Sequence, residues 1–562
     1  MRDAYSVSQV RAAEAALFAL VPEGALMQRA AAGLAAVCSD LLRAGAGGVY
    51  GARIVILAGT GDNGGDALYA GERLARRGAA VTAVQAGAHM HAEAARALAA
   101  AGGRIVTVAP PRDPAATRVD PQAGRDGQPG PSDASPATAG EAADGHQDRY
   151  DAGHEERRVI GQADLIVDGM LGIGGKGGLR EPYATLAQLA ANARNATTVA
   201  VDLPSGIDAD TGAVAGPAVR ADVTVTFGAL KPGLLIDPGA GHAGVVEFVD
   251  IGLGPHLDGT PQASAPQGHD IAALLPRPTA ESDKYRRGVL GLLVGSDRYT
   301  GAALLATGGA VRGGAGMVRL VTFPGAAAAV RPVHPEVIIT ELARETGARS
   351  GSSGLALQGG NSQFPQDVGR VQAWTVGSGM GTDDEAARRL AAVLATSLPV
   401  LIDADALTLL ARHPELLPRS APTLLTPHAG ELGRLLDADP ADIEARRLEY
   451  ARRAASQLGA CVLLKGSTTV VAPPDGLDPV LVNTTGTPWL ATAGTGDVLA
   501  GLAGALLAQG LLPPQAAITA AYLHGLAARL AARELGAEVT EGESPIGASD
   551  LVSALRLAFR AI

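Results

Sequence analysis

The sequence predicts two successive α/β domains, each built on a mostly parallel β-sheet with helices on both faces. Short apolar runs rich in β-branched residues recur along the chain and alternate with Ala-, Leu- and Arg-rich stretches at helical spacing. These runs are nearly continuous rather than alternating, as expected for strands that are covered on both faces. The chain has 562 residues, which is more than one hydrophobic core usually supports, so we expect at least two cores.

The first domain is expected over residues 1–254 as a doubly wound sheet. Several of its strands end in turns rich in Gly, Asp or Ser, where ligands bind in open α/β sheets. Residues 111–158 interrupt the pattern with Pro, Gly, Asp and Ser, so we predict a disordered insertion there. The predicted strands are RIVILAG (53–59), AVTAV (80–84), RIVTVAP (104–110), DLIVDGMLG (164–172), TTVAVDLPSG (197–206), VTVTFGA (223–229) and VVEFVDIG (245–252).

The second domain is expected over residues 271–562, after a polar, Pro-rich linker over 255–270. It repeats the same alternation of apolar runs and helical stretches, and residues 344–370 read as a smaller insertion. The predicted strands are VLGLLVGS (289–296), MVRLVTF (317–323), EVIIT (336–340), AWTVGSGMG (373–381), PVLIDADAL (399–407), TLLTPHAGE (423–431) and CVLLKGSTTVVAPP (461–474).

Composition and charge exclude several classes of function. The formal charge of −11 argues against nucleic acid or an anionic membrane surface as the main partner. Aromatic residues make up 3% of the chain, too few to favour stacking platforms for bases. The two cysteines, Cys38 and Cys461, lie far apart in apolar surroundings, so we expect neither a disulfide framework nor a Cys zinc site.

The apolar stretches indicate a cytoplasmic protein. The N-terminus lacks the long apolar region of a signal peptide. The apolar stretch from Val498 to Leu512 is shorter than the roughly 20 residues that span a bilayer.

In the first half, a Gly-rich turn joins a strand directly to a helix in RIVILAGTGDNGGDALYAGERLARRG (53–78). The helix start offers unpaired N–H groups to an anion, although the spacing differs from the dinucleotide fingerprint and the turn alone would serve packing equally well. Oxygen-bearing side chains also follow two further strands, at Asp168 and at Asp202, Ser205 and Asp208. One such Asp is commonly structural, but strand ends at one edge of a sheet converge, which favours a site for an alkali or alkaline-earth cation.

The motifs GTGDNGGDALYAGERL, DGMLGIGGKGG and VDLPSGIDADTG resemble the YjeF N-terminal domain, the NAD(P)H-hydrate epimerase, which has a Rossmann-like fold. The resemblance implies interconversion of the R and S epimers of hydrated NADH and NADPH. It implies a potassium ion held by Asn63, Asp168 and Ser205. It also implies substrate contacts from Asp62, Asn63, Gly64, Gly65 and Asp66, from Gly172, Ile173, Gly174, Gly175, Lys176, Gly177 and Gly178, and from Asp202.

Epimerisation at a carbon that bears both nitrogen and a hydroxyl proceeds by ring opening or by loss and return of water. Either route needs a proton shuttle and stabilised charge. Lys176 and Asp202 are the candidate catalytic residues, and the alternative for Lys176 is an ion pair with a substrate phosphate.

In the second half, the turn from Ala493 to Gly496 opens an apolar helix within NTTGTPWLATAGTGDVLAGLAGALLAQG (483–510). Backbone N–H groups and the helix dipole therefore point at one spot. Asp497 follows immediately. A lone Asp there would cap the helix, but beside a Gly-rich anion hole it is better interpreted as a base next to a transferring phosphoryl group. The arrangement resembles the ribokinase-like superfamily.

Five further motifs resemble the ADP-dependent NAD(P)H-hydrate dehydratase, in that family's order. They are KYRRGVLGLLVGSDRYTGAALLA (284–306), GSGMG (377–381), DADAL (403–407), LTPHAGE (425–431) and LLKGSTTVV (463–471). The family has GPGLG where this chain has GSGMG. The resemblance implies hydrate binding by Ala302, Gly379, His428 and Asp497, and nucleotide binding by Lys465, Gly466, Ser467, Thr468, Thr469 and Gly496.

The implied mechanism begins when Asp497 activates the ring hydroxyl of the S hydrate, which attacks the β-phosphoryl group of ADP. The amides of Gly494–Gly496 and Mg²⁺ stabilise the charge, phosphate is eliminated, and AMP is released. Both halves thus indicate one bifunctional repair enzyme for hydrated nicotinamide nucleotides, expected as a homo-oligomer.

Two alternatives stay open from the sequence. The first is a kinase of a small hydroxylated metabolite, such as a vitamin precursor, fused to a Rossmann-like domain. It shares the Gly-rich loop and Asp497 but does not account for TPHAGE, KGSTT or the first half. The second makes the first half a ligand-binding or partner-binding module without catalysis.

Overall fold

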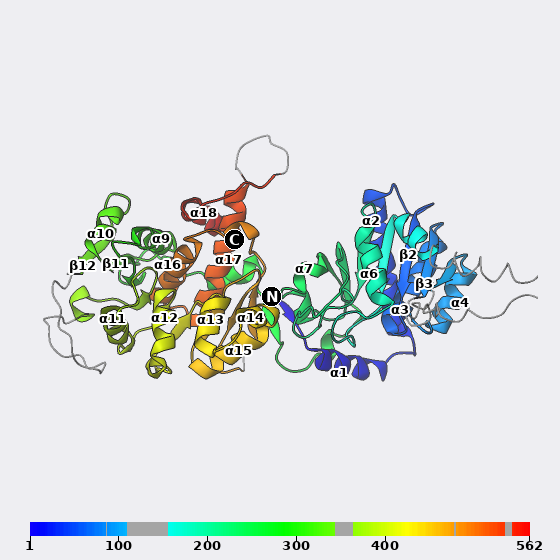
Figure 1. Ribbon diagram of the computed structural model, residues 1–562, viewed down its shortest axis with the longest axis horizontal. Coiled ribbons are helices and arrows are strands. Elements are labelled where there is room, and N and C mark those ends of the chain that lie inside the picture. The colour runs from blue at the N-terminus through cyan, green and yellow to red at the C-terminus, as the bar shows by residue number, and fades with distance from the viewer. Residues whose placement is uncertain (86, 109–154, 343–363, 477–478, 534–541) are drawn as a thin grey trace, which may run out of the picture. The chain divides into compact units, whose positions relative to one another are not determined.

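The chain forms two compact units in the computed structural model (Figure 1). The N-terminal unit comprises Val7–Leu234 and Pro238–Asp258. The C-terminal unit comprises Met1–Ser6, Leu235–Asp237 and Gly259–Ile562. The structure describes residues 1–85, 87–108, 155–342, 364–476, 479–533 and 542–562.

These bounds differ from those expected from the sequence at the N-terminus and around the predicted linker. Strand β1 (Arg2–Ala4) belongs to the C-terminal unit, where it pairs with β9 (Ala263–Ala265), a strand inside the segment expected to be a linker. The predicted insertion at 111–158 lies mostly outside the described residues, and its last four residues, 155–158, are helical.

Among the described residues, the N-terminal unit has a seven-stranded sheet in the order β4-β3-β2-β5-β6-β7-β8, with every neighbouring pair parallel. All seven strands coincide with predicted runs. They are β2 (Arg53–Ala58), β3 (Ala80–Gln85), β4 (Arg104–Thr107), β5 (Leu165–Gly169), β6 (Thr197–Val201), β7 (Val223–Phe227) and β8 (Val245–Val249). The helices are α1 (Val7–Phe18), α2 (Ala25–Gly45), α3 (Asp62–Ala75), α4 (Ala92–Ala100), α6 (Tyr183–Asn192), α7 (Ala240–Ala243), η2 (Pro232–Leu234) and η3 (Gly254–His256).

Helices cover both faces of this sheet, which confirms the doubly wound prediction. Successive residues of β2 point to opposite faces, and Leu57 belongs to a buried cluster with Leu186 of α6. On the other face Ile56 packs so closely under Gly71 of α3 that a Cβ there would lie 2.3 Å from the Ile56 Cδ1 atom.

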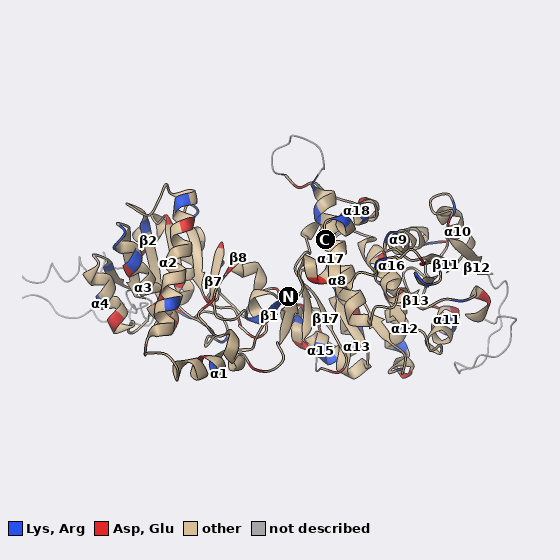
Figure 2. Cartoon of the chain, turned by 180° about the vertical axis from the view of Figure 1, so that it is seen from behind, with Lys and Arg blue, Asp and Glu red and all other residues tan. Residues whose placement is uncertain are grey.

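Helix α2 is the one described helix long and apolar enough to cross a membrane by length and composition. The sequence analysis considered the run from Val498 instead. In the structure Leu34 and Cys38 of α2 are fully buried, and the helix contacts α3 and the strands β6, β7 and β8. These contacts are those of a core helix. Figure 2 shows charged residues of both signs spread over the helices of both units.

The C-terminal unit has an eleven-stranded sheet in the order β1-β9-β18-β17-β16-β15-β14-β13-β10-β11-β12 within the described residues. The strands from β12 across to β16 are parallel, and β17 and β18 continue the sheet antiparallel. The predicted run 461–474 is therefore two strands joined by a turn. The strands not yet bounded are β10 (Val289–Leu293), β11 (Met317–Thr322), β12 (Ile338–Glu341), β13 (Ala373–Val376), β14 (Val400–Ile402), β15 (Thr423–Leu425), β16 (Cys461–Leu464), β17 (Thr469–Ala472) and β18 (Val480–Asn483).

One large buried cluster holds this sheet against α9, α16, α17 and α18, and α15 contacts β16 and β17. Helices α11, α12, α13 and α15 lie on the other side of the sheet (Figure 1). The helices are α8 (Gly268–Leu274), α9 (Thr300–Arg312), α10 (Pro324–Val330), α11 (Asp384–Leu394), α12 (Asp405–Arg412), α13 (Ala429–Leu436), α14 (Pro440–Ala445), α15 (Arg447–Leu458), α16 (Thr495–Ala508), α17 (Pro513–Ala532), α18 (Ala548–Arg560), η4 (Gln366–Val368), η5 (Pro414–Leu416) and η6 (Pro488–Leu490).

Candidate active sites

The candidate site of the N-terminal unit lies at the carboxyl ends of four neighbouring strands. The order β2-β5-β6-β7 brings together the turn after β2, Asp168 at the end of β5, Asp202 after β6 and Lys231 after β7. This is where parallel α/β sheets place their ligands.

The Gly-rich turn after β2 fits only because it lacks side chains. A Cβ on Gly59 would lie 1.9 Å from the carbonyl oxygen of Met170, and one on Gly64 would lie 2.4 Å from the carbonyl oxygen of Gly59. Helix α3 begins at Asp62, directly after this turn, so its first N–H groups face the sheet edge.

Asp168 and Ser205 form the centre of the predicted cation site. The fully buried carboxylate of Asp168 accepts hydrogen bonds from the Ser205 N–H at 2.8 Å and from the Ser205 hydroxyl at 2.7 Å. The amide of Asn63 donates to the Val201 carbonyl at 2.5 Å and to the Leu171 carbonyl at 3.4 Å. The Ser205 hydroxyl lies 3.2 Å from that same Leu171 carbonyl oxygen, so the three predicted residues converge on one backbone segment.

Burial raises the pKa of Asp168 to about 6, and its bonds from Ser205 only partly offset the effect. The ionised carboxylate therefore lacks compensating positive charge in the described structure. No group of three or more His, Cys, Asp and Glu side chains suited to a metal ion occurs among the described residues. A cation here would instead be held by one carboxylate, one amide and one hydroxyl.

Asp202 forms a buried ion pair with Lys231, a residue that the sequence analysis did not consider. Asp202 also accepts from the Thr226 hydroxyl at 3.1 Å and from the Phe227 N–H at 3.3 Å. The available signal was weak: one lysine placed directly after an apolar strand in VTVTFGALKPG (223–233).

Further acidic groups surround Asp202. Burial, followed by the charges of Asp202, Asp62 and Glu14, raises the pKa of Asp66 well above its ordinary value. The Oδ1 atom of Asp66 is buried without a hydrogen-bond partner among the described atoms. Glu14 comes from α1, which carried no motif in the sequence.

The predicted loop Gly172–Gly178 lies under α1. It lines a cavity of about 320 Å³ with Ser8 and Arg11 of α1 and with Asp210. Lys176 is exposed on this loop, and the cation that contacts Asp202 is Lys231 rather than Lys176. The cavity thus has side chains of both charges in its lining, Arg11 and Lys176 beside Asp208 and Asp210.

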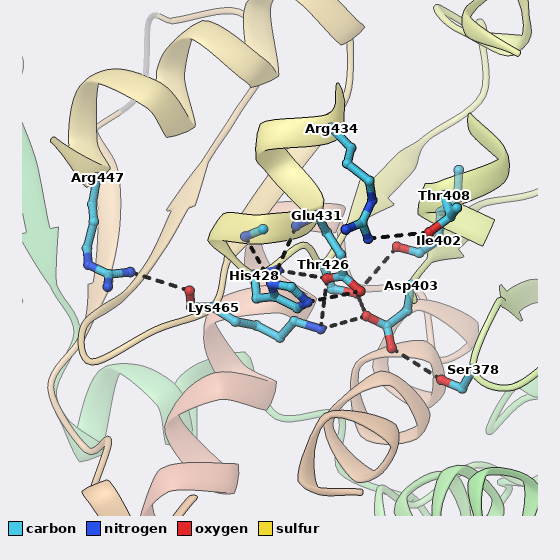
Figure 3. Close-up of polar contacts among 11 residues, drawn as sticks. Ser378, Ile402, Asp403, Thr408, Thr426, His428, Glu431, Arg434, Arg447 and Lys465 are labelled. Carbon is cyan, nitrogen blue, oxygen red and sulfur yellow. Dashed lines mark hydrogen bonds and ion pairs between the residues drawn. The ribbon is translucent and has the colours of Figure 1, made fainter. Parts of the chain in front are cut away.

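The candidate site of the C-terminal unit also lies at the carboxyl ends of neighbouring parallel strands, here β10-β13-β14-β15-β16. Ser378 follows β13, Asp403 follows β14, Thr426 follows β15 and Lys465 follows β16. Figure 3 shows these side chains pointing toward one another.

Asp403 is the centre of this network (Figure 3). Its Oδ1 atom lies 2.8 Å from Nζ of Lys465 and accepts from the Thr426 hydroxyl at 2.8 Å, and its Oδ2 atom accepts from Ser378 at 3.2 Å. Lys465 also lies 3.7 Å from Oε2 of Glu431. Burial opposes the charge of Lys465, but the carboxylates of Asp403 and Glu431 outweigh it, so its pKa is raised and it stays charged.

Helix α16 directs its N-terminus at this network. It begins at Thr495, and the preceding Gly494 has φ 89, a left-handed conformation that favours glycine. A Cβ on Gly496 would lie 3.7 Å from Nζ of Lys465, so the lysine and the first turn of the helix face the same spot. The sequence analysis expects an anion hole at this spot.

Asp497 lies in that first turn. Burial and then the charge of Asp403 raise its pKa to about 6, and a hydrogen bond with Ser378 opposes the rise. An ordinary exposed Asp would be about two units more acidic. The carboxylate of Asp497 is therefore more basic than that of an ordinary Asp at the start of a helix.

The remaining predicted residues surround this spot. A Cβ on Gly379 would lie 3.1 Å from the Cβ of Ala302, so these two positions are in contact. His428 is 57% exposed, and its Nδ1 atom accepts from the N–H groups of Gly430 and Glu431 at the start of α13. His428 therefore caps the start of α13, and its Nε2 atom lies 3.6 Å from Oε1 of Glu431.

The turn Lys465–Thr469 joins β16 to β17. Thr468 is buried in it and bonds Asp237 twice, through the Asp237 N–H at 3.0 Å and to the Asp237 carboxylate at 2.8 Å. Gly466 leaves room for Arg447, since a Cβ there would lie 1.9 Å from its guanidinium. Ser467 is exposed. Asp403, Glu431 and Ser378 stand within motifs of the sequence but were not singled out there as site residues.

Comparisons with known proteins match a different family model to each half of the chain. A family model described as NAD(P)H-hydrate dehydratase matches residues 290–543, and one described as YjeF-related protein N-terminus matches residues 23–233. The bifunctional NAD(P)H-hydrate repair enzyme of Mycobacterium leprae is 42% identical over 566 residues, covering 100% of both chains. The chain belongs to this family of bifunctional NAD(P)H-hydrate repair enzymes.

The repair enzyme of Mycobacterium tuberculosis is 43% identical over 521 residues, which cover 92% of this chain and 91% of the relative. A solved structure of the ADP/ATP-dependent NAD(P)H-hydrate dehydratase from Bacillus subtilis is 30% identical, with a TM-score of 0.43, and covers 52% of this chain and 97% of its own. The repair enzyme therefore has an N-terminal epimerase unit and a C-terminal dehydratase unit.

Proposed function

We propose that the dehydratase unit converts the S epimer of hydrated NADH or NADPH to the dihydronicotinamide with ADP as phosphoryl donor, releasing AMP and phosphate. The observation that carries this proposal is the Asp497 carboxylate in the first turn of α16, beside Lys465 and the open backbone of Gly496. A base next to a phosphoryl-binding hole is what transfer to a hydroxyl requires.

In this proposal Asp497 takes the proton of the substrate hydroxyl, whose oxygen attacks the β-phosphoryl group while AMP departs. The charged Lys465, held by Asp403 and Glu431, faces the transferring group. Mg²⁺, when bound, would neutralise phosphate charge. Phosphate then leaves the hydrate by elimination.

Ala302, Gly379 and the exposed edge of His428 bind the hydrate in this proposal, and the turn Lys465–Thr469 binds the adenine nucleotide. The contact between Ala302 and Gly379 and the buried Thr468 support these assignments. ADP rather than ATP as donor rests on the resemblance of the motifs to the ADP-dependent family.

The epimerase unit interconverts the R and S hydrates in this proposal, so that the dehydratase unit can use both. Asp202 is the proton-transferring carboxylate, and Lys176 acts from the Gly172–Gly178 loop on the proton or on a substrate phosphate. K⁺ fits the neighbouring donors Asn63, Asp168 and Ser205, because the buried Asp168 lacks compensating charge. Bound K⁺ would supply positive charge that orders this edge of the site.

The test is recovery of dihydronicotinamide absorbance from a mixed R and S hydrate, with ADP, with ATP and without nucleotide. We expect full recovery with ADP, and recovery that stops at the S fraction in Asp202→Ala. Recovery with neither nucleotide, together with phosphorylation of another alcohol, would establish the kinase alternative. Cytoplasmic location and a homo-oligomeric state stay predictions, which fractionation and light scattering would check.

A further inference from the structure

Lys231 is a buried lysine whose three donors are all used inside the epimerase unit. Only 1% of its side chain is exposed. Its Nζ atom pairs with Oδ1 of Asp202, and it donates to the Thr226 hydroxyl at 3.1 Å and to the Phe227 carbonyl at 3.4 Å. An ammonium group has three donors, so Lys231 has none left for a substrate.

Asp202, the partner of Lys231, is held by three donors on one carboxylate oxygen. The Oδ1 atom of Asp202 receives the ammonium of Lys231, the hydroxyl of Thr226 and the N–H of Phe227. Because all three donors lie on Oδ1, Oδ2 is the oxygen left to face a ligand. The backbone of Asp202 has φ 66, a left-handed conformation that is strained for a residue with a side chain. Strain of this kind persists where surrounding contacts impose it.

The surroundings of this pair are acidic. Glu14 of α1 interacts electrostatically with Asp202 and Asp62, and Arg11 of α1 adds positive charge there. Asp66 of α3 interacts electrostatically with Asp202, Asp62 and Glu14. Like charges disfavour an ionised carboxylate. The effect is visible at Asp66, where burial and these charges raise the pKa well above its ordinary value. Asp202 differs from Asp66 in having an ammonium group in direct contact.

We propose that Lys231 is the positioning residue of the epimerase site, which supplies the counter-charge of Asp202 and turns its Oδ2 atom toward the substrate. This inference rests on the proposed epimerase function. Lys231 acts through Asp202 and does not touch the substrate. The same site therefore holds two carboxylates in different surroundings: Asp202 is paired with the ammonium of Lys231, and the Oδ1 atom of Asp66 has no hydrogen-bond partner among the described atoms.

Stability alone does not account for a buried pair of this kind. Replacing a buried ion pair by apolar residues of similar volume is often neutral or stabilising, because desolvation of the two charges offsets their attraction. Removing only one partner is costly, since the other charge is left buried and alone. The test therefore needs a readout that altered folding would not move.

The experiment follows interconversion of a purified single epimer of NADH hydrate by the full-length enzyme, without nucleotide, across a range of pH. For Lys231→Met we expect kcat to fall on the order of tenfold to a hundredfold with KM nearly unchanged, because orientation and charge rather than binding are lost. The acid limb of the pH profile moves to higher pH, since the carboxylate has lost its counter-charge. The matched control Thr226→Val removes one donor from the same oxygen but keeps the cation, and it should show a smaller loss and no movement of the limb.

A second variant keeps the test decisive if Lys231→Met folds poorly. Lys231→Ala leaves a cavity beside Asp202, and added methylammonium should restore activity in Lys231→Ala but not in Asp202→Ala. Dehydration of the S epimer by the same samples reports that the chain is folded. If the wild-type chain does not interconvert the epimers, the proposed epimerase function fails. If the wild type does, and Lys231→Met keeps the wild-type pH profile while amine does not rescue Lys231→Ala, the role of Lys231 is overturned.

Discussion

The hydroxyl of Ser378 donates a hydrogen bond to Oδ2 of Asp403 across 3.2 Å and is also hydrogen-bonded to Asp497. Ser378 is 1% exposed, so no solvent takes part in this arrangement. A hydroxyl has one proton, and it can therefore stabilise only one of the two carboxylates at a time. The family motif GPGLG has proline at this position, and proline has no hydroxyl to donate.

The dehydratase activity should depend on pH through Asp497. Burial and the charge of Asp403 raise its pKa to about 6, and the base works only when ionised. We expect kcat/KM for the S epimer to fall as the pH drops through about 6 and to be level above it. Ser378→Ala removes the bond that lowers the pKa of Asp497, so the midpoint should move upward. Initial rates across pH 5 to 8 measure both midpoints, and an unchanged or lower midpoint in Ser378→Ala would contradict this role.

Single substitutions should remove either dehydration or epimerisation and leave the other activity in place. Asp497→Asn removes the base but keeps the size of the side chain, and we expect dehydration to fall about 10²–10⁴-fold, as for loss of a general base. Epimerisation of a purified epimer should continue in this variant, whereas Asp202→Ala should show the reverse pattern. Dehydration that persists in Asp497→Asn would exclude Asp497 as the base.

Lys465 should govern nucleotide binding. Its raised pKa keeps it charged, and it faces the first turn of α16. We expect Lys465→Met to raise KM for ADP on the order of tenfold or more, because a charge-assisted contact to phosphate is lost. Arg412→Met is the matched control: it makes the same charge change at an exposed position at the end of α12. Equal effects of the two substitutions would mean that only net charge matters.

Potassium should stabilise the epimerase unit. Asp168 is buried with Ser205 as its partner, and a cation would offset its unfavourable charge. At ten times the dissociation constant, linkage predicts a gain of about 1.4 kcal/mol. Melting curves in KCl and in LiCl at equal ionic strength would detect it, and Asp168→Asn should abolish the difference. A melting temperature that is the same in both salts would argue against the potassium site.

Most of the strands in both units could be predicted, because buried parallel strands appear as continuous apolar runs. The strands β1, β9 and β18 could not, since they are three or four residues long and carry no such run. Pairing across a long separation in sequence, such as Arg2 with Ala265, has no local signal at all.

The candidate sites were predictable where they lie in turns and not where a single residue reaches in from elsewhere. Asp168 at the end of β5, Ser205 after β6, and Asn63 and Asp497 in the first turns of α3 and α16 lie in or beside Gly-rich motifs, and the structure places each at the edge of its sheet where the strands end. Lys231 could not be predicted, because one lysine after a strand is usually solvated. Its burial depends on Asp202, which follows the neighbouring strand β6.

The path of the chain has a consequence for gene architecture. The C-terminal unit includes Met1–Ser6 and Leu235–Asp237, so the polypeptide passes from one unit to the other after residues 6, 234, 237 and 258. A stop and restart codon placed at 258 would give a downstream product whose strand β9 has lost its antiparallel neighbour β1, and whose Thr468 has lost Asp237. An unpaired edge strand favours aggregation. Fission of this gene into two cistrons would therefore need compensating changes, whereas the fused reading frame needs none.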